Sequence, residues 1–496
     1  MIDILFVNPG DRKVVFQDLG KDATALEPPY LTLSYATYLQ NNGYKVQIID
    51  ANALNISPDE VSQKIAEIQP KVVVLIVYGN QPSASTQNMS IAIKIAKTIK
   101  QKNSNTPLIV GGLHPSALPQ MTLQEIDNET PMGGGHYIIQ GEGPISLKSF
   151  LEMINGKKDI KEVEGLWYFE PDTHEIKHNP RARLIQNLDE YMPLANWDLL
   201  PMDKYRAHNW HCFSSGGERM PYASIYTSLG CPYSCEFCCI NTPFGKSTIR
   251  YRSPDLIVNE LEILNRKYGV KNIKIIDEMF VLHDAHYMSI VDLIIKKELD
   301  LNIWCYARVD TIKLNNLKKM KQAGINWLAL GIESANPSVR DGAAKGLRVN
   351  DIKERVRMVQ NSGINVIGNF IFGLPDDTLD SMQETLDMAK ELNCEFVNFY
   401  CAMAYPGSRL YNIALQQGWK LPEVWHGYSQ HSYEMQPLPS KHCSAKEIVK
   451  FRDNAFNEYF THLPYLDMIE RKFGLEIRQG IEETTKIKLK RKILGD

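Results

Sequence analysis

The chain has 496 residues, with 55 Lys and Arg against 58 Asp and Glu, so its formal charge at pH 7 is -3. This balance gives no reason to expect nucleic acid or a membrane surface as a partner. No apolar run approaches the ~18 residues of a membrane helix, and the first residues lack the basic start of a signal peptide. At ~150 residues per domain, we expect two to four domains in a cytoplasmic protein.

Residues 1–155 alternate short apolar runs with helical patterns. Five runs rich in Val, Ile and Leu predict buried parallel strands: Ile4–Val7, Val46–Ile49, Val72–Val77, Leu108–Val110 and Tyr137–Ile139. Helices are predicted between them at Leu31–Leu39, Pro58–Ile68 and Ile91–Ile99. This alternation predicts a doubly wound α/β domain, flavodoxin-like or Rossmann-like, with its ligand at the carboxyl ends of the strands.

The loops at those strand ends are rich in glycine and small polar residues. They contain Asn8-Pro9-Gly10, the segment from Tyr78 to Thr86, Gly111-Gly112-Leu113-His114 and Gly141-Glu142-Gly143. The turn after the first strand lacks G-x-G-x-x-G, so NAD and FAD are not expected. Glycine lets the backbone approach a large flat ligand closely, and the hydroxyls of Ser85 and Thr86 can donate hydrogen bonds to it.

A connector is predicted at residues 156–215. Gly165–Phe169 and Glu175–Lys177 indicate a small hairpin around Pro171, and a proline-punctuated, aromatic link follows from Leu188 to Pro201. We expect this link to pack against both neighbouring domains and to fix their relative position.

Three cysteines form a motif after the connector, in Cys231-Pro-Tyr-Ser-Cys235-Glu-Phe-Cys238. Nine cysteines, an odd number scattered along the chain, do not predict a disulfide framework. Three thiolates fit a [4Fe–4S] cluster that keeps one iron open. A structural zinc site, which usually needs a fourth Cys or His, and a chance grouping are the alternatives.

Residues 216–425 predict a partial (β/α)6 barrel, with the motif directly after its first strand. The predicted strands are Ser224–Thr227, Ile273–Ile276, Ile303–Ala307, Trp327–Leu330, Ile364–Phe372 and Phe396–Ala402. Ser253 and Pro254 predict a helix start after the motif, and the barrel's working face is expected at the strand carboxyl ends. Residues 426–496 predict a helical extension, with helices at Ala445–Tyr459 and Tyr465–Phe473 and a solvated basic helix face at Lys486–Lys492.

The C-x-x-x-C-x-x-C spacing resembles the signature of the radical S-adenosylmethionine (radical SAM) enzymes. In that family the open iron chelates S-adenosylmethionine, which one electron from the cluster cleaves to a 5′-deoxyadenosyl radical. Together with its N-terminal loops, the chain resembles the radical SAM family with a cobalamin (B12)-binding domain, from Met1 to about Pro406. The resemblance implies three cofactors, the [4Fe–4S] cluster, S-adenosylmethionine and cobalamin, and an electron donor such as flavodoxin or ferredoxin.

The resemblance assigns two sets of site residues. Besides the cluster ligands Cys231, Cys235 and Cys238, it implies cobalamin contacts at Pro9, Gly10, Ser85, Thr86, Gly111, Gly112, His114, Gly141 and Glu142. The Asp-x-His-x-x-Gly loop of mutase-type domains is missing, since His114 is the first histidine of the chain. Cobalt is therefore expected without that axial ligand. His114 is either a contact to the corrin or its tail, or a turn histidine satisfied by the backbone.

The second set lies at the barrel mouth. The resemblance implies contacts to S-adenosylmethionine from Phe237, Asp277, Glu278, Arg308, Glu333, Ser334 and Asn369. A carboxylate at Asp277 or Glu278 can pair with the ammonium group, and the Arg308 guanidinium matches a carboxylate of substrate or methionine. The alternative for each is a polar residue that stabilises a loop, and for Phe237 an ordinary aromatic core residue. Lys345-Gly346 and Pro406-Gly407-Ser408 resemble loop landmarks of the family.

The resemblance implies an enzyme that cleaves S-adenosylmethionine reductively and methylates an unactivated carbon through methylcobalamin. The alternatives are a cyclase or oxidoreductase with the same cofactors, a radical SAM enzyme whose N-terminal domain is an empty scaffold, and a non-catalytic sensor. The substrate class stays open among small molecules, lipids, tetrapyrroles and peptides.

Overall fold

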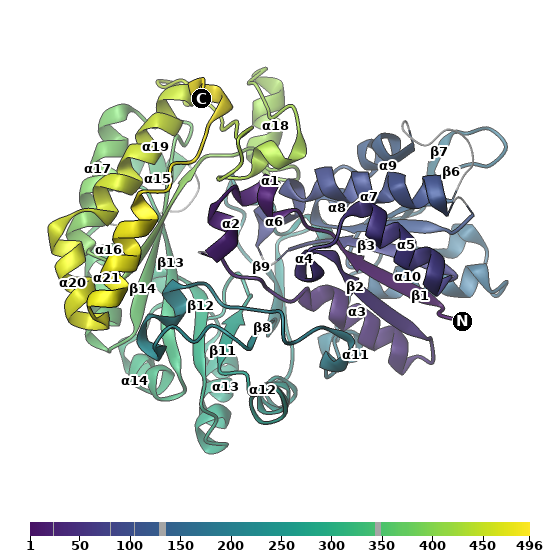
Figure 1. Cartoon of the computed structure of the whole chain (residues 1–496), viewed down its shortest axis with the longest axis horizontal. Coiled ribbons are helices and arrows are strands. Elements are labelled where there is room, and N and C mark those ends of the chain that lie inside the picture. Colours follow the sequence, from purple (N-terminus) through teal and green to yellow (C-terminus); the bar gives the residue numbers. More distant parts are fainter. Residues whose placement is uncertain (23, 80, 104, 128–134, 343–348) are drawn as a thin grey trace.

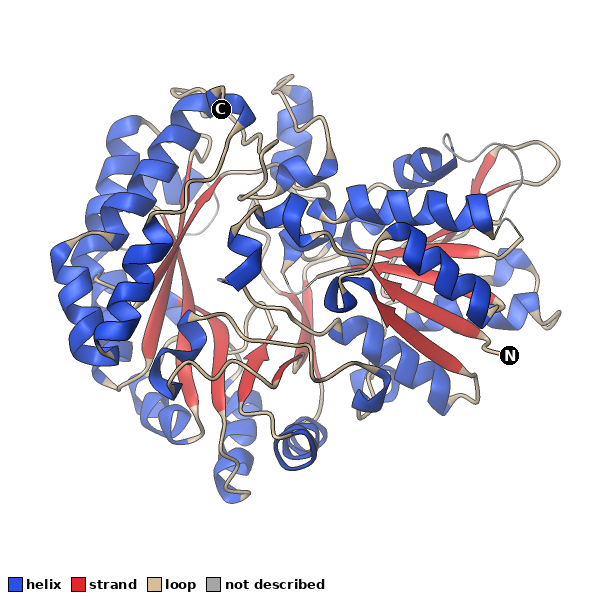
Figure 2. Ribbon diagram, in the orientation of Figure 1, coloured by secondary structure: helices blue, strands red, loops and turns tan. Residues whose placement is uncertain are grey.

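The computed structural model describes residues 1–22, 24–79, 81–103, 105–127, 135–342 and 349–496. It contains two parallel sheets, each flanked by helices, which Figures 1 and 2 show on opposite sides of the molecule. The N-terminal half carries one sheet, and the second forms a half-barrel whose outer side is covered by the C-terminal helices (Figure 1). The predicted architecture of a doubly wound domain followed by a partial barrel and a helical extension is confirmed.

The N-terminal sheet has the order β2-β1-β3-β4-β5, all parallel. Its strands are β1 Ile4–Asn8, β2 Val46–Asp50, β3 Val72–Val77, β4 Leu108–Gly112 and β5 His136–Ile139. Its helices are α1 Arg12–Phe16, α2 Leu19–Asp22, α3 Tyr30–Asn41, α4 Ala51–Leu54, α5 Pro58–Ile68, α6 Pro82–Gln87, α7 Met89–Lys102, α8 Leu113–Ala117, α9 Pro119–Asp127 and α10 Pro144–Ile154.

Local sequence accounts for these elements. All six residues of β3 are buried, as expected for a central strand covered on both faces. Helix α5 begins with a capping box between Ser57 and Glu60 and has Pro58 at its first position, where a missing backbone N–H costs nothing.

The predicted hairpin in the connector is present and extends the first sheet. Strand β6 (Leu166–Phe169) pairs antiparallel with β5 and with β7 (Ile176–His178). The following segment holds the short helix α11 (Leu188–Tyr191) and runs to the second sheet.

The half-barrel has the order β15-β14-β13-β12-β11-β8, with every pair parallel. Its strands are β8 Tyr222–Ile225, β11 Asn272–Ile275, β12 Asn302–Arg308, β13 Ile325–Glu333, β14 Asn365–Phe372 and β15 Phe396–Cys401. Its helices are α12 Pro254–Tyr268, α13 Asp284–Lys296, α14 Leu314–Gln322, α15 Pro337–Gly342, α16 Val349–Asn361, α17 Leu379–Leu392 and α18 Arg409–Gln416.

The first barrel strand ends earlier than predicted, at Ile225 rather than Thr227. The next residues, Ser228–Cys231, form strand β9, which pairs antiparallel with β10 (Thr248–Tyr251). This two-stranded ribbon holds both ends of the cysteine loop.

The C-terminal helices are α19 Ala445–Phe460, α20 Leu463–Phe473 and α21 Leu475–Thr485. The prediction of a solvated basic helix face at Lys486–Lys492 is right about the lysines, which are exposed, and wrong about the helix and about Arg491. This segment is non-helical up to a 3-10 turn at Lys492–Leu494, and Arg491 is fully buried, with two nitrogens donating to the carboxylate of Asp453 at 3.0 Å. The charge count of the segment could not reveal a carboxylate 38 residues earlier in the chain.

A buried hydrogen-bond network joins the two halves. The Arg252 guanidinium donates to Glu260 at 2.7 Å and to the hydroxyl of Tyr30 from α3 at 2.6 Å. Trp197 of the connector donates to the other oxygen of Glu260 at 3.2 Å. Because the Arg252 and Glu260 side chains are both fully buried, their charges are stabilised by each other and by these hydrogen bonds rather than by water.

Candidate functional site between the two sheets

The cysteine loop runs between β9 and β10 and is held by one amide side chain. Asn241 accepts a hydrogen bond from the backbone N–H of Cys231 at 3.1 Å and donates to the carbonyls of Cys231 and Tyr233 at 2.9 and 3.0 Å. Gly230 has φ +90°, and a Cβ there would lie 2.3 Å from the carbonyl oxygen of Thr248. Glycine is therefore needed where the ribbon leads into the loop.

The three motif thiols fit the predicted cluster. Cys231, Cys235 and Cys238 are all free and partly exposed, whereas the adjacent Cys239 is buried. Among the described residues, no group of three or more His, Cys, Asp or Glu side chains surrounds a single metal-ion position. A [4Fe–4S] cluster makes a different demand, because each thiolate binds its own iron.

Asp277 and Glu278 follow β11 but have different surroundings. The Asp277 carboxylate accepts from the backbone N–H of Thr227 at 2.6 Å and from the hydroxyls of Thr227 and Ser228. Asp277 therefore fixes the segment that leads into the cysteine loop, and a direct contact of Asp277 with S-adenosylmethionine stays a prediction.

Glu278 is the carboxylate that remains available. It makes no hydrogen bond or ion pair with the part of the chain that the structure describes, and it lines a hollow with Ser228, Gly230 and Tyr226 beside the cysteine loop. Burial raises the pKa of Glu278 to about 7, which Lys274 opposes and Asp277 reinforces. A cationic ligand in this hollow would stabilise the ionised carboxylate, so Glu278 fits the predicted partner of an ammonium group.

Arg308 lies at the cysteine loop. Its guanidinium pairs with Asp310 at 2.9 Å and lies 4.2 Å from the ring centre of Tyr233, a loop residue. Glu333 ends β13 in a left-handed conformation with φ +67°, next to an irregularity in the pairing with β14. Such strain in a residue other than glycine is typical of functional positions.

The other residues predicted to contact S-adenosylmethionine do not line the hollow beside the cysteine loop. The Ser334 hydroxyl is buried against Thr385 at 3.2 Å, which indicates a loop-stabilising role. Asn369 accepts from Asn398 at 2.9 Å and faces the central cavity, and Phe237 packs in two small apolar clusters. Lys345 and Gly346 lie outside the described residues.

The carboxyl ends of β3, β4 and β5 surround a glycine-lined hollow. Its floor is apolar and its rim contains Gly111, Gly112, Gly141 and Gly143, under Tyr35. Gly112 has φ +141°, and a Cβ there would lie 2.2 Å from the carbonyl oxygen of Val77. Glycine at position 112 is therefore required by the packing of β4 against β3, and the contact of this strand edge with cobalamin stays a prediction.

Ser85, Thr86 and His114 are brought together under this edge. The Ser85 hydroxyl accepts from the backbone N–H of His114 at 2.9 Å, and the Thr86 hydroxyl lies 3.3 Å from Nδ1 of His114. The His114 ring packs edge-on against Trp425 at 4.4 Å, and its Nε2 has no partner among the described residues. Burial lowers the pKa of His114 to about 3, so the ring is neutral at pH 7.

The remaining predicted cobalamin residues divide between two places. Glu142 pairs with Arg250 of β10 at 2.7 Å, with both side chains buried, so it links the N-terminal rim to the cysteine ribbon. Pro9 lines the central cavity, and a Cβ on Gly10 would lie 2.5 Å from Asn52.

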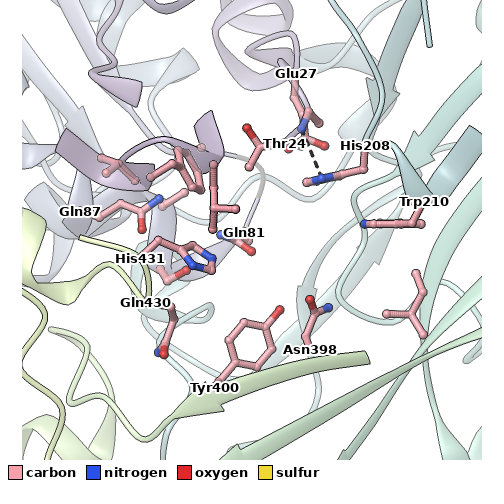
Figure 3. Close-up of a pocket in the computed structure, with 18 of the residues that line it drawn as sticks. Thr24, Glu27, Gln81, Gln87, His208, Trp210, Asn398, Tyr400, Gln430 and His431 are labelled. Carbon is pink, nitrogen blue, oxygen red and sulfur yellow. Dashed lines mark hydrogen bonds between the residues drawn. The ribbon is translucent and has the colours of Figure 1, made fainter. Parts of the chain in front are cut away.

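The central cavity lies between the N-terminal strand ends and the inside of the half-barrel (Figure 3). From the N-terminal half it is lined by residues of α1 and of the loops after β1, β2 and β3, and from the barrel by residues of β11, β12, β13, β14 and β15. In Figure 3, Gln430 and His431 lie on one side of it, Trp210 lies on the other, and Tyr400 and Asn398 lie between them.

The sequence analysis missed an ion pair in this cavity. Lys274 of β11 is buried, lies 3.2 Å from Glu27 of the N-terminal half, and sits 4.7 Å from the ring centre of Trp304. Glu27 also accepts from the Tyr222 hydroxyl at 3.1 Å. A lysine between two isoleucines in a buried strand was the available signal, because such a charge requires a partner.

The fold and the site define a class of protein with two cofactor-binding domains that share one cavity. Comparisons with protein families identify both. The model of the B12 binding domain matches residues 23–150, and that of the radical SAM superfamily matches residues 225–389. The chain therefore combines a B12 binding domain with a radical SAM domain, as predicted, and its cofactors are cobalamin, a [4Fe–4S] cluster and S-adenosylmethionine.

Similar proteins span most of this chain. An uncharacterised methyltransferase of Pyrococcus horikoshii is 29% identical over 93% of this chain and 93% of its own. The anaerobic magnesium-protoporphyrin IX monomethyl ester cyclase of Rubrivivax gelatinosus is 25% identical over 82% and 69%. The structure of the radical SAM methyltransferase TsrM from Kitasatospora setae, with cobalamin and a [4Fe–4S] cluster, has a TM-score of 0.68 at 16% identity, over 98% and 100% of the chains. None of the described helices is long and apolar enough to cross a membrane.

Proposed function

We propose that this protein is a cobalamin-dependent radical SAM methyltransferase that methylates an unactivated carbon of a small-molecule, lipid or peptide substrate. The observation that carries the proposal is the shared cavity, which is lined by strand ends of the B12 binding domain and by inward-facing residues of the radical SAM barrel. A reactive radical must meet its partner before it meets water, so both cofactor domains have to open on one enclosed space.

The chain's own residues have distinct tasks in this proposal. When bound, the cluster with S-adenosylmethionine supplies a 5′-deoxyadenosyl radical, and cobalamin supplies the methyl group. Cys231, Cys235 and Cys238 hold the cluster, and the Glu278 carboxylate holds the ammonium group of S-adenosylmethionine.

A separate strand edge and the walls of the cavity complete the site. The glycine-lined edge of β4 and β5 holds the cobalamin. Buried aromatic side chains, among them Trp210 and Trp304, exclude water from the space between the two domains. The electron comes from an external donor such as flavodoxin or ferredoxin, in a cytoplasmic setting.

The relatives support methyl transfer and one second candidate. The Pyrococcus horikoshii relative, which matches over nearly the whole chain, is called a methyltransferase. The Rubrivivax gelatinosus relative is called a cyclase and matches over a smaller share of both chains. A cyclase or oxidoreductase that uses the same cofactors is therefore the second candidate.

An isotope experiment separates the two candidates. The protein is reconstituted anaerobically with iron, sulfide and cobalamin, reduced, and incubated with S-adenosylmethionine carrying a trideuterated methyl group and a small-molecule and lipid extract. The proposal predicts a product that carries the deuterated methyl group and is missing with the Cys235→Ala variant. A product formed in step with 5′-deoxyadenosine but without deuterium would favour the cyclase or oxidoreductase.

A further inference from the structure

The permanent charges on the cavity wall do not balance. The described lining residues carry three such cations, Arg12, Lys274 and Arg452, and two carboxylates, Asp11 and Glu27. Both carboxylates are committed, because Asp11 caps α1 by accepting from the backbone N–H of Val14 at 3.1 Å, and Glu27 pairs with Lys274. Asp11 keeps its own charge, so these five lining groups leave one net positive charge, and Arg12 and Arg452 are the lining cations other than the paired Lys274.

Arg452 is held in place but shares its carboxylate. This α19 residue is 6% exposed, donates from Nε to the carbonyl of Phe399 at 2.8 Å and from Nη1 to Asp453 at 2.7 Å. The fully buried Arg491 binds the same Asp453 through two nitrogens. Two buried guanidinium groups on one carboxylate leave an excess positive charge at the cavity wall, which is costly without an anion.

Arg12, the second guanidinium group on the cavity wall, lies on α1. It donates to the carbonyls of Gly20 and Ala25 and to the hydroxyl of Thr24, all of them uncharged acceptors. Burial, together with the positive charges of Arg206 and Arg219, lowers the pKa of Arg12 to about 10, which the charge of Glu27 opposes.

His431 lies beside these cations without adding a charge. Burial and the nearby Arg452 and Arg491 lower the pKa of His431 to about 3, so its ring is neutral at pH 7. Its ring centre lies 5.8 Å from that of Phe16 on α1, and its Nδ1 has no hydrogen-bond partner in the described part of the chain. A neutral imidazole can donate one hydrogen bond to a ligand held by the arginines.

Another wall of the cavity is aromatic. Trp210 packs against Trp304 at 5.2 Å and against Phe396 at 5.6 Å between ring centres, and all three line the cavity together with Phe460. In Figure 3, Trp210 lies across the open space from His431. The cavity thus presents an aromatic wall, over which the paired Lys274 lies, and the guanidinium group of Arg452 elsewhere on its lining.

From this arrangement we infer that the substrate of the proposed methyl transfer is an anion, with a carboxylate or phosphate group bound at Arg452 beside His431 and an apolar or aromatic body against Trp210 and Trp304. The inference rests on the proposed function, whose cavity it interprets. Guanidinium groups bind carboxylate and phosphate with directed, charge-assisted hydrogen bonds, whereas a neutral substrate would leave the excess charge unmatched.

Matched probes test the inference. The protein loaded with cobalamin and cluster is titrated anaerobically, by calorimetry, with 1-naphthoate, 1-naphthyl phosphate and the neutral 1-naphthamide, which share one aromatic body. We expect at least one anion to bind about tenfold more tightly than the amide, the size expected for charge-assisted hydrogen bonds. Equal affinities of the wild-type protein for all three probes would overturn the inference, whatever the variants do.

Variants of Arg452 test whether this residue binds the anionic group. Arg452→Met should remove the preference for the anion and leave 1-naphthamide binding within about twofold, and Arg452→Lys should restore part of the preference. Arg471→Met, on the exposed surface of α20, is the matched control and should change nothing. A folded Arg452→Met protein that keeps the full preference would refute the assignment.

Two further measurements distinguish a failure of the anion inference from a failure of the proposed function. If the preference is found only in cobalamin-free protein, the cations serve the phosphate of the cofactor and the inference is wrong. Formation of 5′-deoxyadenosine is measured in the same preparations. Its absence beside an intact anion preference would contradict the proposed function and leave the anion site standing.

Discussion

The buried charge network between the two halves yields a quantitative prediction. Arg252 and Glu260 are both fully buried, and Glu260 accepts hydrogen bonds from Arg252, Tyr30 and Trp197. In Glu260→Gln the Arg252 charge stays buried without its carboxylate, which costs about 3–5 kcal/mol. In Tyr30→Phe the hydroxyl that accepts from Arg252 and donates to Glu260 is lost, at a cost of about 2 kcal/mol, because both partners are charged.

Thermal unfolding measures both changes. At about 1 °C per kcal/mol for a chain of 496 residues that unfolds as one unit, Glu260→Gln should lower the unfolding midpoint by roughly 4 °C and Tyr30→Phe by roughly 2 °C. The control is Asp198→Asn, which breaks an ion pair with Lys267 in which both side chains are more than half exposed, and it should cause no measurable shift. A midpoint for Glu260→Gln equal to that of Asp198→Asn would refute the argument that this network joins the halves.

Three further predictions follow from local geometry. Gly112→Ala places a Cβ against the carbonyl of Val77 and should distort the carboxyl ends of β3 and β4, so bound cobalt should fall; wild-type cobalt content in this variant would contradict a cobalamin site at this strand edge. Asn241→Ala removes the hydrogen bonds that hold the cysteine loop and should lower the amount of iron bound after reconstitution. An unchanged iron content would contradict a role of Asn241 in holding the loop. Burial lowers the pKa of His114 and of His211 to about 3, so below pH ~6.5 these histidines bind protons in the unfolded chain but not in the folded protein. The free energy of unfolding should therefore fall by about 1.4 kcal/mol for each histidine and each pH unit below that value. A urea midpoint that stays constant from pH 7 to pH 5 would disprove this.

The regular elements were predictable because their signals are local. The apolar run Val72–Val77 predicted β3 to the residue, and the helical pattern at Pro58–Ile68 predicted α5 to the residue. The order and spacing of the three cysteines gave the radical SAM domain in the same way, since a short loop contains the whole pattern.

The partners of buried charges were not predictable. Nothing in the local sequence connects Lys274 with Glu27, 247 residues away, or Arg491 with Asp453. The same limit applies to Asp277 and Glu278, adjacent residues after one strand. In the structure, Thr227 and Ser228 donate hydrogen bonds to Asp277, whereas Glu278 lines the hollow beside the cysteine loop. This difference depends on tertiary packing.

In the proposed function, cobalamin and a radical-generating cluster serve one reaction in one protein. Anaerobic reconstitution of the wild-type, Cys235→Ala and Gly112→Ala proteins, followed by measurement of bound cobalt and of 5′-deoxyadenosine formed from S-adenosylmethionine, tests this proposal. We expect cobalt and cleavage in the wild type, cobalt without cleavage in Cys235→Ala, and cleavage without stoichiometric cobalt in Gly112→Ala. A wild-type protein that binds cobalt but forms no 5′-deoxyadenosine, or that cleaves S-adenosylmethionine without ever binding cobalt, would contradict it.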